Sequence, residues 1–107
     1  MAGFVYIMSN RRNGTLYAGV TADLVRRVWE HRNGAGSTFV RRYGLHRLVF
    51  FEPHDDIRVA IQRETNIKGW PRAWKVRLLE WDNPEWVDLY PSLVEDPTWL
   101  EIPRRSG

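Results

Sequence analysis

The sequence predicts a small α/β domain in which a short, mostly antiparallel three-stranded sheet is flanked by helices. Two observations support this prediction. Residues 4–31 read in order as strand, tight turn, strand and helix, the pattern of a hairpin followed by a covering helix. A third strand-like run at residues 46–52 then precedes two helical segments, which a Gly-Trp-Pro break at residues 69–71 separates.

Length and composition limit the possible classes of protein. The chain has 107 residues, enough for one domain with a modest core. Its hydrophobic content of 43% and charged content of 27% are typical of a soluble globular protein. The absence of cysteine excludes disulfides and thiolate metal sites and fits a reducing cytoplasm. We expect no signal peptide and no membrane span, because no basic segment precedes the first apolar run and no apolar stretch reaches about 18 residues.

Positive charge is concentrated in the first three quarters of the chain. The net charge is only +3, but residues 1–79 contain 14 Lys and Arg against six Asp and Glu, whereas residues 80–107 contain two against seven. Nearly all the basic residues are arginines, which make bidentate contacts with phosphate. This distribution favours a polyanionic partner. A solvated arginine-rich surface is the alternative interpretation.

Each strand of the hairpin carries a tyrosine. Both faces of the first strand, residues 3–9, are mostly apolar, so we expect this strand to be central and covered on both sides. Side chains alternate along a strand, and Tyr6 and Tyr17 have opposite parity, so any loop of even length places them on the same face. A two-residue loop at Asn13-Gly14 or a four-residue loop at residues 11–14 does this, whereas a three-residue loop does not.

The second strand, at about residues 15–20, leads directly into a helix. Gly19 near the end of this strand indicates close approach of a neighbouring group, either substrate or the adjacent helix. Thr21 is the predicted N-cap, and Asp23 favours the positive helix end. The helix extends to about residue 32, where Asn33-Gly34 ends it. Four-residue spacing places two pairs on neighbouring stripes: Leu24 with Val28 toward the core, and Arg27 with His31 beside them.

Residues 34–44 are glycine-rich and predict an exposed loop. This segment contains Phe39, Arg41, Arg42 and Tyr43, which are able to contact a nucleic-acid backbone. The third strand follows, and we expect it to end at Pro53.

A second helix, capped by Asp55 or Asp56 and extending to about residue 68, carries a carboxylate on its inward face. Its apolar stripe, on which Glu64 also falls, comprises Ile57, Ala60, Ile61 and Ile67. An inward carboxylate is costly unless it is paired or binds a cation. Two interpretations stay open: Glu64 binds a metal ion, or it pairs with Lys68 or with an arginine.

A third helix begins after Pro71 and extends to about residue 81, and Asn83-Pro84 closes it. From residue 90 onward the chain contains three prolines and scattered acidic residues. We therefore expect one domain at residues 1–89 and a C-terminal tail at residues 90–107. This tail is expected to lack a core of its own and to be held by Trp99 and Leu100.

Several short motifs resemble those of the GIY-YIG nuclease family. Phe4-Val5-Tyr6 stands where the family has GIY, with only the tyrosine literal, and Tyr17-Ala18-Gly19 stands where it has YIG. The run T-x-D-L-x-x-R-x-x-x-H at residues 21–31 is similar to the family's helix signature and is far more specific. Arg63-Glu64 and Asn83-Pro84 follow in the expected order, so the resemblance covers roughly residues 4–89. The chain looks most like the small stand-alone bacterial members, which lack appended DNA-binding domains.

The resemblance implies an endonuclease that hydrolyses phosphodiester bonds by attack of an activated water. The implied catalytic residues are Tyr6, Tyr17, Arg27, His31, Glu64 and Asn83. Glu64 is the implied ligand of Mg²⁺ or Mn²⁺, and one carboxylate suffices because such an ion keeps several waters. The residues expected to bind nucleic acid are Arg26, Arg41, Arg42, Arg63 and Lys68. The two tyrosines share the activation and orientation of water, although a tyrosine base needs nearby cations to lower its pKa from about 10.

These residues also have ordinary structural roles that the sequence leaves open. The tyrosines fit as core aromatics, Arg27 as an ion-pair partner of Asp23, His31 as an exposed residue at a helix end, and Asn83 as a helix-terminus residue before proline. Most of the six tryptophans fit the core. Trp70 and Trp74 lie among arginines and are also suited to stacking on nucleic-acid bases.

The sequence thus predicts a metal-dependent endonuclease, with DNA as the expected substrate and RNA as the alternative. The runner-up function is a non-catalytic nucleic-acid-binding module on the same fold, and a third option is a protein-interaction domain whose acidic tail contacts a partner. An inward Glu64 together with Arg27 and both tyrosines favours the enzyme, because a binding module has no use for that glutamate. Strong sequence specificity is not expected without a second, sequence-reading domain.

Overall fold

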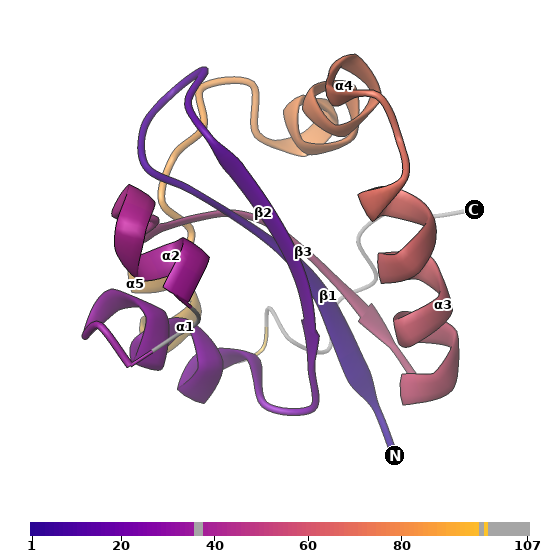
Figure 1. Cartoon of the computed structure of the whole chain (residues 1–107). Helices are drawn as coiled ribbons and strands as arrows, with labels where there is room; N and C mark the ends of the chain where they lie inside the picture. The colour runs from indigo at the N-terminus through magenta and orange to yellow at the C-terminus, as the bar shows by residue number, and fades with distance from the viewer. Residues whose placement is uncertain (36–37, 97, 99–107) are drawn as a thin grey trace.

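The computed structural model describes residues 1–35, 38–96 and 98, which form a three-stranded antiparallel sheet with helices on both faces (Figure 1). The predicted fold class is confirmed. No helix in this described part of the chain is long and apolar enough to cross a membrane. In chain order the elements are β1 (Gly3–Ser9), β2 (Leu16–Thr21), α1 (Leu24–Arg32), α2 (Thr38–Tyr43), β3 (Arg47–His54), α3 (Ile57–Lys68), α4 (Arg72–Asp82) and α5 (Tyr90–Glu95).

β1 is the central strand, as its two apolar faces predict, and the sheet order is β2-β1-β3. β1 pairs antiparallel with β2, with Tyr6 opposite Gly19 and Met8 opposite Tyr17. Tyr6 and Tyr17 therefore lie on the same face of the sheet. The loop between the two strands, residues 10–15, is longer than either predicted loop. Its length is even, however, so the predicted arrangement of the tyrosines is confirmed.

A separate hydrophobic core lies on each face of the sheet. Figure 1 shows α1, α2 and α5 on one side of the strands and α3 and α4 on the other. The first core contains the buried side chains Tyr6, Met8, Leu24, Val28, Val40, Leu45, Leu48, Phe51 and Leu93. The second contains Val5, Ile7, Ala18, Val49, Phe50, Ala60, Ile67, Leu78, Leu79 and Trp86. Burial on both faces explains why β1 shows no alternation of polar and apolar residues.

Two predicted boundaries differ for local reasons. The N-cap of α1 is Asp23, whose carboxylate accepts a hydrogen bond from the Arg26 amide at 3.2 Å, and not Thr21. The Thr21 hydroxyl instead accepts from the Asp23 amide at 3.1 Å, so it supports the cap. Pro53 lies within β3 instead of ending it. An edge strand tolerates proline because the missing N–H faces away from the sheet.

The predicted loop at residues 34–44 contains the short helix α2. Gly34 and Gly44 adopt positive φ angles of 77° and 63°, a conformation that favours glycine after a helix. They therefore bracket this segment, and Val40 anchors it with a side chain that is 1% exposed. The two glycines therefore mark the ends of helices, whereas residues 34–44 were expected to form one continuous loop.

The segment that follows residue 89 packs against the domain. α5 places Leu93 in the core around Tyr6, and its side chain is 1% exposed. Tyr90 lies beside α1, with its ring centroid 4.7 Å from the Arg32 guanidinium carbon. α5 thus has no core of its own, as expected of this segment, but it shares the core of the domain through Leu93. Trp99 and Leu100, which were expected to hold the tail, lie outside the described residues.

Leu93→Ala is expected to lower the free energy of unfolding by about 2–4 kcal/mol, because it removes most of a fully buried side chain. The neighbouring Val94→Ala is the matched control, since Val94 on the same helix is 49% exposed. That change should cost less than about 0.5 kcal/mol. Chemical denaturation measures both values, and equal effects would contradict the packing of α5.

Candidate active site

Two tyrosines from adjacent strands lie together on one face of the sheet. Tyr6 on β1 is 2% exposed, Tyr17 on the edge strand β2 is half-buried, and their ring centroids are 6.4 Å apart. Gly19 makes room for the Tyr6 ring, because a Cβ at residue 19 would lie 2.5 Å from both Cζ and the hydroxyl oxygen of Tyr6. The close approach predicted at Gly19 is confirmed, but the neighbouring group is the Tyr6 side chain of the adjacent strand and not the adjacent helix.

α1 adds a histidine and an arginine to these tyrosines. His31 is 1% exposed, and its Nε2 is hydrogen-bonded to the Tyr6 hydroxyl at 2.9 Å. The interpretation of His31 as an exposed helix-end residue is therefore wrong. Within the described chain, its buried Nδ1 has no hydrogen-bond partner. Arg27, one turn earlier, is half exposed and forms an ion pair with Glu30 at 3.7 Å, while the carboxylate of Asp23 caps the helix.

Burial and neighbouring charges act on both members of the Tyr6–His31 pair. Burial raises the pKa of the Tyr6 hydroxyl, nearby Tyr17 adds to the rise, and the Arg27 guanidinium opposes it. Burial also lowers the pKa of His31 below its ordinary 6.5, and Arg27 acts in the same direction. His31 is therefore a neutral imidazole near pH 7. Arg27 is the cation that acts on both side chains.

α3 contributes a shielded carboxylate. The Glu64 side chain is 13% exposed and lies close enough to Tyr6 to raise the pKa of its hydroxyl. Its Oε2 is 3.1 Å from Nζ of Lys68, whose side chain is 51% exposed and whose Nζ is 6.0 Å from the Tyr17 ring centroid. Glu64 is thus shielded from solvent, as its place on the inward stripe predicted. It is also paired with Lys68, which was the alternative to metal binding. Ile61, predicted on the same inward stripe, is instead 48% exposed.

α2 borders the tyrosines with an exposed aromatic and basic surface. Phe39 stacks on Tyr17, with ring centroids 6.0 Å apart and an interplanar angle of 28°, and Tyr43 follows at 4.7 Å from Phe39. Arg41 and Arg42, predicted to bind nucleic acid, are exposed on the same helix. Sequence reasoning identified these residues but missed the contact of Phe39 with Tyr17, because it treated the segment as a loop.

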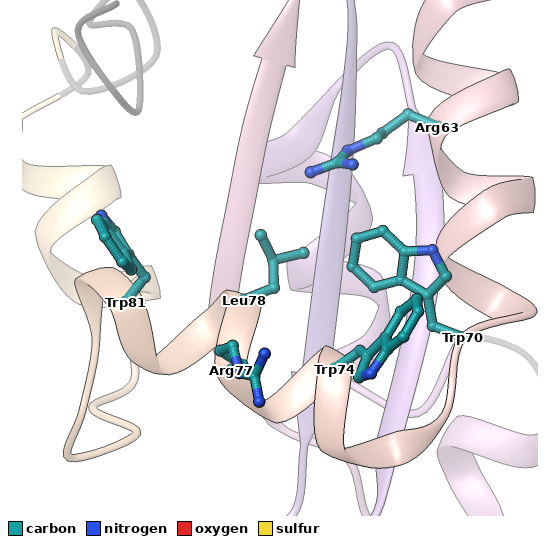
Figure 2. A pocket seen from close by; sticks show the side chains of 6 residues that line it. All are labelled: Arg63, Trp70, Trp74, Arg77, Leu78 and Trp81. Carbon is teal, nitrogen blue, oxygen red and sulfur yellow. The ribbon is translucent and has the colours of Figure 1, made fainter.

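The remaining predicted nucleic-acid-binding residues lie in different places. Arg26 is exposed on α1 and pairs with Glu30 at 3.6 Å. Arg63 on α3 donates from Nε and Nη2 to the two carboxylate oxygens of Glu52, at 3.1 and 3.3 Å. Its guanidinium also lies over the Trp70 ring, 5.2 Å from the centroid (Figure 2). Arg63 therefore belongs to a separate cleft between α3 and α4.

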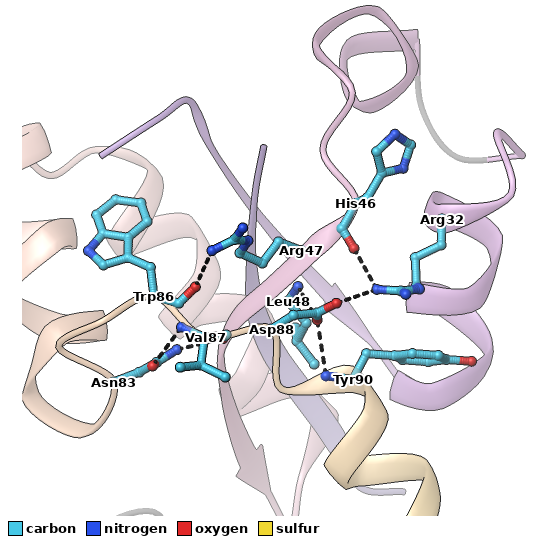
Figure 3. A network of polar contacts seen from close by, with 9 residues as sticks. All are labelled: Arg32, His46, Arg47, Leu48, Asn83, Trp86, Val87, Asp88 and Tyr90. Carbon is cyan, nitrogen blue, oxygen red and sulfur yellow. Dashed lines mark hydrogen bonds and ion pairs between the residues drawn. The ribbon is translucent and has the colours of Figure 1, made fainter. Parts of the chain in front are cut away.

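Asn83 fastens α4 to the sheet. Its side-chain amide donates to the carbonyl of Val49 at 3.0 Å. The amide also donates to the carbonyl of Val87 at 2.9 Å, and Oδ1 accepts from the Val87 amide at 2.9 Å (Figure 3). These contacts satisfy a buried amide with backbone groups. They support the structural interpretation of Asn83 as a helix-terminus residue. A direct catalytic role for Asn83 stays a prediction.

Asp88, which no sequence motif marks, holds the end of α1 in place. Its carboxylate accepts hydrogen bonds from the Arg32 guanidinium and from the amides of Leu48 and Tyr90, the last two at 3.0 and 3.1 Å (Figure 3). Because Arg32 follows His31 directly, this network fixes the helix end that positions the histidine. Only the fold brings these residues together, so no local signal in the sequence identifies them.

Glu64 is a shielded carboxylate in this part of the described structure that could serve as an oxygen ligand of a cation. Among the described residues, no group of three or more His, Asp or Glu side chains could hold a metal ion. One shielded carboxylate still suits an ion of the Mg²⁺ type, which binds through one or two carboxylates and keeps water ligands. The Lys68 ammonium already occupies a position 3.1 Å from the Glu64 carboxylate, so a positive charge is stable there. Its long, half-exposed side chain can extend into solvent when another cation binds.

Five side chains thus converge beside the first hairpin, and we refer to them as the tyrosine cluster: Tyr6, Tyr17, Arg27, His31 and Glu64. Such groups can bind a phosphate, position a water and move protons. Fold and site together define a small α/β domain that carries a candidate site for phosphate chemistry. The family model described as the GIY-YIG catalytic domain matches residues 2–77, and the chain belongs to the GIY-YIG family.

Relatives of similar size support this membership. A UPF0213 protein of Natronomonas pharaonis is 41% identical over 76 residues, which are 71% of this chain and 88% of that protein. A UPF0213 protein of Enterobacter sp. is 34% identical over 94 residues, 88% of this chain and 90% of that protein. The solution NMR structure of the UPF0213 protein BH0048 from Bacillus halodurans has a TM-score of 0.50 and 30% identity, covering 78% of this chain and 87% of its own. The names of these relatives state no activity.

Proposed function

We propose that this protein is a metal-dependent endonuclease that hydrolyses phosphodiester bonds of nucleic acid, with DNA as the expected substrate. The observation that carries the proposal is the shielded carboxylate of Glu64 beside the tyrosines: its partner Lys68 lies 6.0 Å from the Tyr17 ring centroid, and Glu64 acts electrostatically on the Tyr6 hydroxyl. A protein that only binds nucleic acid uses cationic groups. It gains nothing from a carboxylate held out of solvent beside its phosphate-binding surface. Membership of the GIY-YIG family supports nuclease chemistry at the level of class.

The proposed roles follow from position. Arg27 is half exposed and acts electrostatically on both Tyr6 and His31, so its guanidinium is placed to bind the scissile phosphate and stabilise the charge that develops there. Tyr6 and Tyr17 activate and orient the attacking water; because burial raises the pKa of the Tyr6 hydroxyl, Arg27 and a bound cation would have to offset that rise for Tyr6 to lose its proton. We assign the His31 proton to Nε2, because the partnerless Nδ1 is then an acceptor and not a buried N–H. His31 thus donates to the Tyr6 oxygen and favours negative charge there when the Tyr6 proton leaves.

The proposed reaction is hydrolysis. The water oxygen attacks phosphorus, one backbone P–O bond breaks, and the leaving oxygen takes up a proton. Glu64 would hold Mg²⁺ or Mn²⁺, which when bound supplies positive charge near the phosphate oxygens. The exposed side chains of Arg26, Arg41 and Arg42 lie on α1 and α2, the helices that border the tyrosine cluster. They are placed to hold the backbone in register without reading sequence.

A cleavage assay tests this proposal against the binding-module alternative. The full chain is incubated with single-stranded, duplex and branched DNA and RNA, in the presence of Mg²⁺, Mn²⁺ or EDTA. We expect cleavage that requires the divalent ion and that Tyr17→Phe reduces. Binding without cleavage of any substrate under any of these conditions would leave a non-catalytic nucleic-acid-binding module as the function.

Affinity for nucleic acid is expected to fall steeply with salt concentration. Each phosphate contact contributes about 0.9 to the slope of log affinity against log salt. Replacing both Arg41 and Arg42 with glutamine should reduce this slope by roughly 2. Arg58→Gln is the control, because Arg58 is exposed on α3 and already paired with Asp56 at 2.8 Å. Fluorescence anisotropy at several salt concentrations measures the slopes, and a flat wild-type slope would rule out a polyanionic partner.

A further inference from the structure

A second candidate site lies between α3 and α4. It is a cleft of about 350 Å³ lined by Arg63, Trp70, Trp74, Arg77, Leu78 and Trp81 (Figure 2). None of these residues is a member of the tyrosine cluster. The volume falls in the range of small-molecule sites, so it is large enough for part of a ligand to enter.

Aromatic surface dominates the cleft. The rings of Trp70 and Trp74 meet edge to face, with centroids 6.0 Å apart and an interplanar angle of 70°. Trp74 is 52% exposed and Trp81 is 69% exposed. Figure 2 shows the indole of Trp74 beside that of Trp70, with Trp81 at the far end of α4. A flat apolar group that covers one of these rings removes indole surface from water, which favours binding.

Two arginines give this aromatic cleft a positive charge. Arg63 is oriented by Glu52 and by the Trp70 ring, and the ion pair engages only Nε and Nη2. Its other guanidinium N–H groups remain able to donate to a ligand. Arg77 is exposed on α4, and none of the described residues that line the cleft is acidic. The complementary ligand therefore combines a flat aromatic group with negative charge.

We propose that this cleft binds an unpaired nucleotide of nucleic acid, with its base against Trp74 and its phosphate against Arg77 or Arg63. Aromatic side chains beside cationic groups are the usual platform for single-stranded nucleic acid, whereas bases in a duplex hide their faces in the stack. Arg63 directly precedes Glu64 on α3, so the cleft and the tyrosine cluster share one helix. The inference rests on the proposed function for its choice of ligand, and it gives that function a preference for single-stranded or branched substrates.

The test is binding in EDTA, so that cleavage does not enter. Two labelled probes are compared by anisotropy: a short oligothymidylate and an abasic strand of the same length. The wild-type protein should bind the oligothymidylate more tightly, because only that probe offers bases to stack. Trp74→Ala should weaken binding of the oligothymidylate by roughly 5- to 150-fold and leave binding of the abasic strand unchanged. Trp74→Phe should retain most of the preference.

Trp29→Ala is the matched control, because Trp29 on α1 is 54% exposed and lies outside the cleft. It should affect binding of neither probe. Equal losses for both probes in Trp74→Ala, or no loss for the oligothymidylate, would overturn the proposal. If the Trp74 effect is found but the protein cleaves no substrate, the proposal for the cleft stands and the proposed nuclease activity is wrong. If the protein cleaves nucleic acid but binds both probes equally, only the proposal for the cleft is wrong.

Discussion

Glu64→Gln is expected to abolish metal-dependent cleavage while leaving the fold and nucleic-acid binding nearly intact. The change keeps the shape of the side chain and removes the negative charge that an oxygen-ligated cation requires. Lys68, the ion-pair partner, is half exposed. Loss of that pair should therefore change the free energy of unfolding by about 1 kcal/mol or less. The rate of Mg²⁺-dependent cleavage and the Tm, measured on one preparation, separate a metal ligand from a structural carboxylate.

Lys68→Met is the matched control, because it breaks the same ion pair and leaves the carboxylate in place. If the pair is only structural, the two variants should have similar effects on stability and neither should abolish cleavage. If Glu64 binds the ion, Lys68→Met should retain cleavage at saturating substrate. It should also lower the Mg²⁺ concentration needed for half-maximal rate, because a competing ammonium is removed. A Glu64→Gln protein that still cleaves would contradict the proposed mechanism.

The part of the site that local geometry governs could be predicted from the sequence. The shared face of Tyr6 and Tyr17 depends only on the alternation of side chains and an even loop length, and the register of β1 and β2 confirms it. The spacing of Arg27 and His31 depends only on the period of a helix. These rules act within one hairpin and one helix, so they hold whatever the rest of the chain does.

The rest of the site depends on contacts between elements that are distant in sequence. His31 is buried because α1 packs on the face of the sheet from which the Tyr6 ring projects, and that ring lies against the histidine. No pattern within α1 shows this. Leu93 likewise enters the core from a segment that its composition describes as a tail. The sequence poses metal binding and pairing with Lys68 as alternatives for Glu64. In the folded chain, Glu64 is shielded and paired at once.

Gly19→Ala is expected to lower the rate of cleavage by roughly 100-fold, although glycine has no functional group. The new Cβ would lie 2.5 Å from both Cζ and the hydroxyl oxygen of Tyr6, so the ring must move. Tyr6 is buried and hydrogen-bonded to His31, so this movement breaks that bond. Misplacing a reacting group by about 1 Å can cost roughly 100-fold in rate. The crowding should also lower the free energy of unfolding by about 1–3 kcal/mol.

Gly69→Ala is the matched control for this change. Gly69 has a φ of −84°, and a Cβ there would meet the carbonyl oxygen of Asn66 at 3.6 Å, an ordinary contact. Cleavage should be unchanged, and stability should be unchanged or raised by up to about 1 kcal/mol. A double-mutant cycle then identifies the route of the Gly19 effect. If that effect passes through the Tyr6 hydroxyl, adding Gly19→Ala to Tyr6→Phe should cost little further rate. It should still cost stability, because the ring remains. Additive losses of rate would show instead that Gly19 matters through direct approach of the substrate to the β2 backbone.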